Sequence, residues 1–385
     1  MRTYRLGADD ARALPPALAN LFLLCSYHAM SAIKGRGAPS NSESSRFNLP
    51  AREADGDWLD HQRADDEDMP APLRTSITIE TPRTIITRNS SPDIGFSQSI
   101  NAFRGCEHGC IYCFARPTHA RLDLSPGLDF ESKLFVKPEA AALLRKELAK
   151  PSYEVRTIAM GTNTDPYQPI EGKWRITRAI IEVLAECRHP LMITTKSDRV
   201  TRDIDLLGPM AAQGLVAIAL SVTTLDPETH RRLEPRAPRP AKRIAAIRAL
   251  SAAGIPVHAS LSPMIPAIND HEIEALAETV AAAGARSISH IPVRLPFEVA
   301  PLFRQWLSEH YPERAGKVMN LIREMRGGQD NDPGFGSRMR GQGPYAALMR
   351  ARFEKARKRF GLEGGRIELR KDLFVPPAGA QGRLF

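Results

Sequence analysis

Residues 101–117, NAFRGCEHGCIYCFARP, decide how the rest of the chain is interpreted, because they gather three cysteines in one short stretch. Cys106, Cys110 and Cys113 follow the pattern CxxxCxxC, and Tyr112 stands directly before the last cysteine. A [4Fe–4S] cluster is normally held by four cysteine thiolates, so a loop with three leaves one iron without a protein ligand. The stretch therefore predicts a metal centre with one coordination position open. An open position of this kind also distinguishes catalytic zinc sites from structural ones.

A single zinc ion and a disulfide framework are the alternatives to a cluster. Structural zinc loops usually carry paired CxxC-type knuckles, and the two other cysteines, Cys25 and Cys187, lie far from the loop. His108 could complete a Cys₃His set, but closing a tetrahedron inside one short loop would strain it. A chain of 385 residues with five cysteines is also unlike a disulfide-stapled domain. The cluster is favoured, and zinc stays open.

The composition allows a full hydrophobic core and places most of the net charge near the C-terminus. Hydrophobic residues make up 42% of the chain, and the net charge of +9 suggests an anionic partner, with nucleic acid ahead of a membrane. Residues 301–385 hold 17 Lys and Arg against 9 Asp and Glu, so +8 of the +9 lies there. A solvated basic surface is the equal alternative to a nucleic-acid contact.

The sequence offers no candidate for a membrane span, since it contains no run of about 18 apolar residues. The apolar stretch ALANLFLLC, which ends at Cys25, is too short, and Asp9 and Asp10 are unlike the start of a signal peptide. A cluster with free thiolates also suits a reducing compartment. We predict a cytoplasmic protein with no membrane partner.

Four parts are predicted along the chain. Residues 1–29 are an extension or follow a misplaced start codon, because Met30 opens a stretch that would serve as a start. Residues 30–73 are rich in Gly, Ser, Asn and acidic residues and are predicted to be a flexible arm, although IKGRG within them could equally be ordered beside an active site. Residues 74–300 are predicted to form an α/β barrel domain, and residues 301–385 a basic helical extension.

The barrel prediction rests on apolar strand-like runs that alternate with helical ones. Strands are expected in residues 76–89, 96–105, 155–165, 191–197, 215–224, 255–263 and 286–296, and helices in residues 137–150, 176–187, 203–214, 241–254 and 271–284. Apolar strands separated by helices indicate a parallel sheet with right-handed crossovers. Six such units predict a partial (β/α)6 TIM-like barrel, whose working residues lie at the carboxyl ends of its strands.

The cysteine pattern, with an aromatic residue before the third cysteine, resembles the signature of the radical S-adenosylmethionine enzymes. The resemblance implies that the open iron binds the amino and carboxylate groups of S-adenosylmethionine. It also implies a one-electron donor such as flavodoxin or ferredoxin. The reduced cluster would cleave the sulfonium and release a 5′-deoxyadenosyl radical, which would abstract hydrogen from the substrate.

Polar side chains at successive predicted strand ends are candidates for holding such a ligand. Thr164 and Asp165 follow the second strand and could accept hydrogen bonds from its ammonium group, unless TDP is simply a turn. Lys196 follows the third strand and could pair with the carboxylate. Ser221, in the fourth strand, could donate a further hydrogen bond. Each signal is weak alone, but together at successive strand ends they indicate a ligand site.

Further segments make the resemblance narrower. The cysteine loop together with TDPYQPIE, ITTKS, ALSVTT and SPMIPAIND resembles the spore photoproduct lyase-like branch, often labelled DNA repair photolyases. IKGRGAPSN and FGSRMRGQGPYA resemble a bacterial subfamily of that group, so the likeness runs from about Met30 to the end. It implies that Tyr112 lies by the adenine, that residues 263–269 line the nucleoside side, and that the substrate is nucleic acid.

One departure from that branch concerns hydrogen return. The spore lyase uses an extra cysteine, a few tens of residues after the cluster loop, but here no cysteine lies between Cys113 and Cys187. Cys187 ends an apolar helix and is interpreted as structural, and Tyr167 is left as a conceivable replacement. A non-catalytic iron–sulfur or zinc nucleic-acid-binding protein, and a radical enzyme modifying RNA or protein, remain alternatives.

The C-terminal part is expected to contain helices near residues 302–309 and 317–328 and a long basic helix over residues 340–362. In the long helix we predict an inward apolar set of Ala347, Leu348, Phe353 and Phe360, and an outward basic set of Arg350, Arg357 and Lys358. That basic face could track a phosphate backbone or simply be solvated. The last five residues, QGRLF, resemble a sliding-clamp docking peptide with the anchors Gln381, Leu384 and Phe385.

Overall fold

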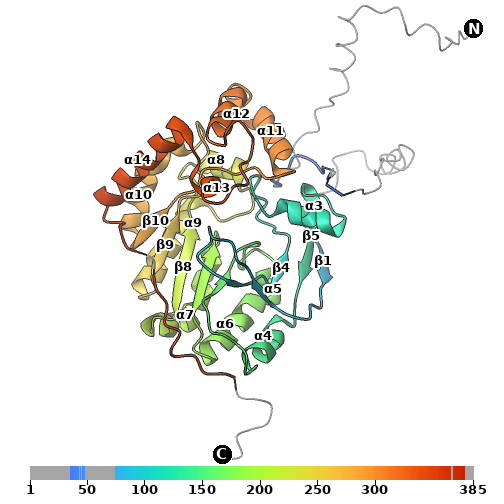
Figure 1. The fold of residues 1–385 in the computed structure, drawn as a ribbon, viewed down its shortest axis with the longest axis vertical. Coiled ribbons are helices and arrows are strands. Elements are labelled where there is room, and N and C mark those ends of the chain that lie inside the picture. The colour runs from blue at the N-terminus through green and yellow to red at the C-terminus, as the bar shows by residue number, and fades with distance from the viewer. Residues whose placement is uncertain (1–34, 43, 45, 48–73, 366, 378–385) are drawn as a thin grey trace, which may run out of the picture.

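The computed structural model describes residues 35–42, 44, 46, 47, 74–365 and 367–377 (Figure 1). Its main feature is a seven-stranded sheet in the order β10-β9-β8-β7-β6-β3-β2. The strands are β2 (Ile86–Arg88), β3 (Gln98–Ile100), β6 (Ile158–Met160), β7 (Leu191–Thr195), β8 (Val216–Ser221), β9 (Val257–Ser260) and β10 (Ser287–Ser289). All neighbours from β3 to β10 pair in parallel, and β2 is antiparallel to β3. Six parallel strands in chain order confirm the predicted partial barrel.

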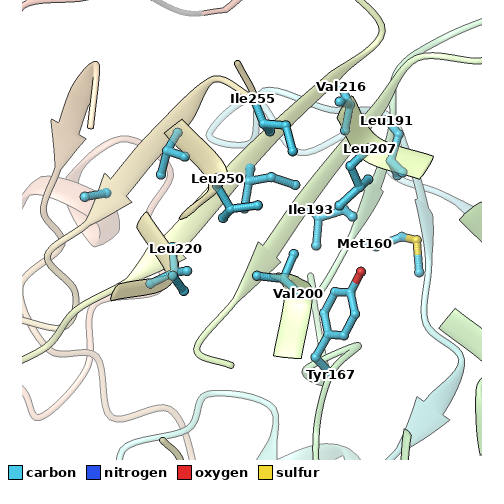
Figure 2. Close-up of a cluster of buried hydrophobic side chains, with 14 of the residues drawn as sticks. Met160, Tyr167, Leu191, Ile193, Val200, Leu207, Val216, Leu220, Leu250 and Ile255 are labelled. Atoms are coloured by element: carbon cyan, nitrogen blue, oxygen red, sulfur yellow. The ribbon is translucent and has the colours of Figure 1, made fainter. Parts of the chain in front are cut away.

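Five helices form the crossovers between these strands: α4 (Ala140–Leu148), α6 (Ile176–Glu186), α7 (Ile204–Ala212), α9 (Pro240–Ala252) and α10 (Ile273–Ala282). In β7 the side chains alternate between fully and partly buried, because Leu191 and Ile193 face the helices. Figure 2 shows these two side chains in one buried cluster with Met160, Leu207 and Leu250. This layer fixes the strands whose carboxyl ends carry the site.

A second sheet, in the order β1-β5-β4, was not predicted from the sequence. It joins β1 (Ser76–Ile79), β5 (Lys133–Val136) and β4 (Phe103–Arg104). The stretch predicted as one or two strands therefore forms two, and they enter different sheets. β5 escaped prediction because it continues directly from the short helix α3 (Leu128–Ser132) without turn residues between them.

Shorter helices complete the barrel: η2 (Arg116–Leu122), α5 (Glu171–Trp174), η3 (Asp198–Asp203), α8 (Pro227–Leu233) and η4 (Asp270–Glu272). The C-terminal part adds α11 (Val299–His310), α12 (Ala315–Glu324), α13 (Ser337–Arg340) and α14 (Gly343–Arg359). In Figure 1, α11, α12 and α14 gather at one end of the molecule, and α4, α6 and α7 lie at the other. Among the described residues, no helix has the length and apolarity needed to cross a lipid bilayer.

The predicted inward face of α14 is wrong in two of its four positions. Leu348 is 55% exposed and Ala347 is exposed, whereas Phe353 is buried and Phe360 is half-buried. The buried stripe is Ala346, Met349, Phe353 and Ala356, at helical spacing. The stripe therefore combines two alanines with Met349 and Phe353, and it leaves Leu348 on the exposed side of the helix.

The predicted basic face of α14 is also largely engaged within the protein. Arg350 Nη1 donates to the Gly341 carbonyl at 3.3 Å, and Arg357 Nε lies 3.2 Å from a Glu354 carboxylate oxygen. Of the three predicted cations, Lys358 is exposed. The proposed docking anchors at residues 381–385, the extension at residues 1–29 and Cys25 all lie outside the described residues.

Candidate active site

A cavity of about 350 Å³ lies at the carboxyl ends of the parallel strands and brings the predicted site residues together. Its lining includes all eight of them: Cys106, Cys110, Tyr112, Cys113, Thr164, Asp165, Lys196 and Ser221. They come from the loops after β4, β6 and β7 and from the end of β8. Pro263, from the predicted nucleoside-side loop, lines the cavity as well. The expectation that parallel strand ends would meet in one place is therefore met.

The cysteine loop is held from behind by Arg116, which is fully buried. Its guanidinium donates to the carbonyls of Cys110 at 2.9 Å and Gly109 at 3.2 Å and pairs with the carboxylate of Glu131. The amide of Cys106 donates to the Phe130 carbonyl at 3.0 Å. These contacts fix the loop backbone, so the three thiols keep their places without a metal.

The thiol arrangement fits a cluster better than a single ion. All three cysteines are free thiols, and within the described ranges no three His, Cys, Asp or Glu side chains converge closely enough to hold one metal ion. Tetrahedral zinc, with Zn–S bonds near 2.3 Å, would need sulfur atoms roughly 3.8 Å apart. Each cysteine of a cluster binds a separate iron, so a wider arrangement suits it. His108 Nδ1 lies 3.4 Å from Asp165 Oδ2, so this side chain is held against that carboxylate.

Residues 35–42, which are part of the predicted arm of residues 30–73, pack behind the same loop. The amides of Gly37 and Ala38 donate to the Glu131 carboxylate at 3.0 and 2.8 Å, and Arg36 Nη1 donates to the Glu131 carbonyl at 2.8 Å. Glu131 thereby joins this segment to Arg116. These contacts place the GRG part of IKGRG beside the cysteine loop.

We expect Gly37→Ala to loosen the cysteine loop, because a Cβ at residue 37 would lie 1.5 Å from the Gly109 carbonyl oxygen. Overpacking of this kind typically costs about 1–3 kcal/mol. The matched control is Gly316→Ala in α12, where an added Cβ meets nothing within 4 Å. Iron bound per chain after anaerobic reconstitution, together with thermal melting, checks the prediction. Equal iron retention in both variants would contradict it.

Asp165 organises the strand ends rather than offering free lone pairs to a ligand. Its Oδ1 accepts from Thr195 Oγ1 at 2.7 Å and from the Tyr167 amide at 2.9 Å, and its Oδ2 accepts from the Lys196 amide at 2.7 Å and faces His108. Burial opposes ionisation, but His108 and these hydrogen bonds outweigh it and lower the pKa of Asp165 to about 2. The carboxylate is therefore charged, with all four lone-pair positions facing protein groups.

Thr164 keeps acceptor capacity, since its hydroxyl donates to the Phe103 carbonyl at 3.0 Å and its oxygen lone pairs remain. Lys196 and Ser221 differ from both residues. Within the part of the chain that the structure describes, the Lys196 ammonium and the Ser221 hydroxyl make no hydrogen bond, and Lys196 contacts the Tyr112 ring at 5.8 Å from its centroid. Burial opposes the charge on Lys196, but Glu234, Cys110 and Asp165 together outweigh it and raise the Lys196 pKa. A half-buried cation without a protein acceptor in the described residues suits an anionic ligand group.

A buried ion pair that the sequence analysis missed lies beneath the cavity. Glu234 and Arg243 pair directly, and Glu234 also accepts from the Tyr112 hydroxyl and from Thr223 Oγ1, the latter at 2.8 Å. Arg243 Nη1 donates to the Ser221 carbonyl at 3.1 Å. Burial opposes ionisation of Glu234, yet Arg243 and Lys196 lower its pKa. The signal for this pair was a charge on the apolar face of the helix over residues 241–254.

Two remaining predictions concern residues away from the cavity. Tyr167 is fully buried and donates to Asp203 Oδ2 at 3.0 Å, and it lies inside the hydrophobic cluster of Figure 2. Its suggested role as a hydrogen donor is therefore wrong. Cys187 follows α6 and is buried in the same core, which confirms its structural role.

Comparisons with known proteins agree with this geometry. The Radical SAM superfamily model matches residues 100–280. An uncharacterized protein of Mycobacterium tuberculosis is 40% identical over 230 residues, which are 59% of this chain and 68% of that protein. An uncharacterized protein of Methanocaldococcus jannaschii is 29% identical over 226 residues, or 59% of this chain and 81% of that protein.

Solved structures of spore photoproduct lyase share the fold. The lyase complexed with dinucleoside spore photoproduct superposes with a TM-score of 0.51 at 17% identity, covering 74% of this chain and 79% of that one. A mutant of the lyase with bound AdoMet and dinucleoside spore photoproduct gives a TM-score of 0.52 at 16% identity. With the matched barrel, the 40% identical relative and the three-thiol cavity, the chain belongs to the radical SAM superfamily and is a radical SAM enzyme, whose cofactors are a [4Fe–4S] cluster and S-adenosylmethionine.

Proposed function

We propose that this enzyme abstracts a hydrogen atom from a nucleic-acid substrate. The observation that carries the proposal is the meeting of three thiols, a half-buried ammonium and a free hydroxyl in one cavity, at the strand ends of a fold shared with spore photoproduct lyase. Family membership favours this function over the non-catalytic binding protein. The dinucleoside ligand in the lyase structures supports a nucleic-acid substrate over a protein one.

Within this proposal each of the predicted site residues has one task. The thiolates of Cys106, Cys110 and Cys113 would hold the cluster and leave one iron open to S-adenosylmethionine. When both are bound and an electron is supplied, they provide a 5′-deoxyadenosyl radical that removes a hydrogen atom from the substrate. The protein itself binds, orients and shields these partners.

Each remaining group would bind a different part of S-adenosylmethionine. Lys196 and Ser221 would bind its carboxylate, because their polar atoms face the cavity without a partner in the described residues. Thr164 would accept a hydrogen bond from its ammonium, and the nearby Asp165 would favour that cation by charge alone, as its oxygens already face protein groups. Tyr112 would lie by the adenine, held in place by Glu234.

Lys196→Met should weaken binding of S-adenosylmethionine at least tenfold, which is about 1.4 kcal/mol, while iron content stays that of the wild type. The reason is the loss of the cation assigned to the carboxylate. Lys150→Met, at an exposed lysine after α4, is the matched control. Calorimetric titration of the anaerobically reconstituted protein measures both affinities. If the two variants bind equally well, Lys196 does not contact the ligand.

The substrate proposal is tested by following an isotope. The reconstituted enzyme is reduced with dithionite in the presence of S-adenosylmethionine and ultraviolet-irradiated oligothymidylate that carries deuterium on its carbons. We expect deuterium in the 5′-deoxyadenosine product, read by mass spectrometry, and none from a deuterated peptide of similar length. If S-adenosylmethionine is cleaved but 5′-deoxyadenosine takes up no deuterium from DNA, and instead takes it up from RNA or from the peptide, the substrate is RNA or protein.

A further inference from the structure

One arginine on the cavity wall has no assigned task. Arg294 follows β10, the last parallel strand, and lines the cavity together with Ile291 and with Met339 of α13. It is half-buried, and its Nη1 lies 3.4 Å from the Met339 sulfur. The groups assigned to S-adenosylmethionine come from earlier strands. Arg294 is therefore not among the groups assigned to that ligand.

The guanidinium of Arg294 has fewer hydrogen-bond and ion-pair partners within the described residues than it could bind. Its Nε is buried without a hydrogen bond, and no carboxylate pairs with it among the residues that the structure describes. The two acids whose charges act on Arg294 are bound elsewhere, since Asp93 pairs with Arg338 and Asp332 accepts from the Gly334 amide at 2.8 Å. A half-buried guanidinium with an unused N–H is costly unless a ligand supplies the acceptor.

Other buried arginines differ at their terminal nitrogens, which protein groups bind, although Arg326 Nε lacks a hydrogen bond among the described residues just as Arg294 Nε does. Arg116 and Arg243 each pair with a buried glutamate. Arg326 of α12 donates to the carbonyls of Pro292 at 2.7 Å, Val293 at 2.8 Å and Arg338 at 2.7 Å. Arg326 thereby ties α13 to the segment just before Arg294. The wall that carries the unpaired guanidinium is thus fixed in place.

A second set of contacts holds α13, which lines the cavity beside Arg294, from the other edge of the sheet. Arg338 donates to Ser91 Oγ at 2.7 Å and pairs with Asp93, and the Gly336 amide donates to Asp93 Oδ1 at 2.7 Å. Residues 91–93 lie between β2 and β3, whereas β10 is at the far edge. The contacts therefore bridge the open side of the partial barrel, and Arg294 faces the cavity beneath this bridge.

We propose that Arg294 binds a phosphate of the substrate backbone and so positions a nucleotide in the cavity, an inference that rests on the proposed nucleic-acid substrate. A guanidinium presents N–H donors in a planar fork that matches phosphate oxygens. Its charge is already partly desolvated, so a bound phosphodiester would meet it without displacing an internal acid. Arg294 is a positioning residue, since it is not assigned to the reacting atoms.

The test compares two forms of fluorescein-labelled (dT)12, one with phosphodiester linkages and one with neutral methylphosphonate linkages. Binding to the reconstituted enzyme with S-adenosylmethionine present is followed by fluorescence anisotropy across a salt series. For Arg294→Met we expect about tenfold weaker binding of the phosphodiester form. One lost phosphate contact should also reduce the slope of log K against log salt by about 0.7. Binding of the methylphosphonate form should not change.

Two further variants make the result specific. Arg359→Met, at an exposed arginine of α14, removes the same charge from the surface and should change phosphodiester binding by less than twofold. Arg294→Lys should recover part of the affinity, because it restores the charge without the fork. Equal weakening of both oligonucleotides by Arg294→Met, or no weakening of either, would overturn the inference.

Failure of the inference and failure of the proposed function give different results. If deuterium from DNA or RNA reaches 5′-deoxyadenosine while Arg294→Met binds the phosphodiester form like the wild type, the inference about Arg294 is wrong and the function stands. If no nucleic acid donates its label but the charge-dependent loss at Arg294 remains, the anion site stands and the substrate class is wrong.

Discussion

Cys110→Ser is expected to abolish 5′-deoxyadenosine formation and to leave less than one iron per chain after reconstitution, against about four in the wild type. A [4Fe–4S] cluster in this loop has three protein ligands, so removing one leaves two irons without a protein ligand. The Cys110 carbonyl is bound by Arg116, so the loop backbone should keep its place. The loss is therefore chemical and not a consequence of unfolding.

The matched control is Cys187→Ala, which removes a cysteine buried in the hydrophobic core. It should keep its iron and its activity and lose only some stability, because it leaves a small cavity. Iron, sulfide and zinc analysis of both variants decides between the metals. A wild-type protein that reconstitutes with one zinc, or a Cys110→Ser variant that still cleaves S-adenosylmethionine, would contradict the cluster assignment.

The barrel and the cavity lining could be predicted because both depend on short patterns of neighbouring residues in the sequence. Strands such as residues 191–197 are apolar runs bounded by helical segments, and the carboxyl ends of successive parallel strands meet at one edge of the sheet. Once the order of strands is known, Asp165, Lys196 and Ser221 must lie near the cysteine loop. The sequence therefore predicted which side chains line the cavity, though not their partners.

The supporting contacts could not be predicted because they join residues that are distant along the chain. Glu131 meets Gly37, 94 residues away, and no pattern in either segment indicates the other. Asp165 was assigned to the ligand, but its oxygens face four groups of the protein itself. In α14 the predicted inward set included Ala347 and Leu348, but the buried stripe lies one position away from each, at Ala346 and Met349.

Arg243→Met is expected to destabilise the protein by about 3–5 kcal/mol, because it leaves Glu234 buried without its cation. Both side chains are almost fully buried, at 1% and 0% exposure, so solvent cannot take over the role of the lost partner. The same change removes the donor to the Ser221 carbonyl at the end of β8. Urea denaturation monitored by circular dichroism measures the loss.

Arg243→Met combined with Glu234→Gln separates the buried charge from the rest of the network. Gln at residue 234 still accepts from the Tyr112 hydroxyl, and the pair of substitutions removes one charge of each sign near Lys196. The double variant should regain most of the lost stability, a coupling that two independent sites would not show. If its stability equals the sum of the two single losses, the buried pair is not what holds the floor of the cavity, and packing around the Arg243 side chain carries that role instead.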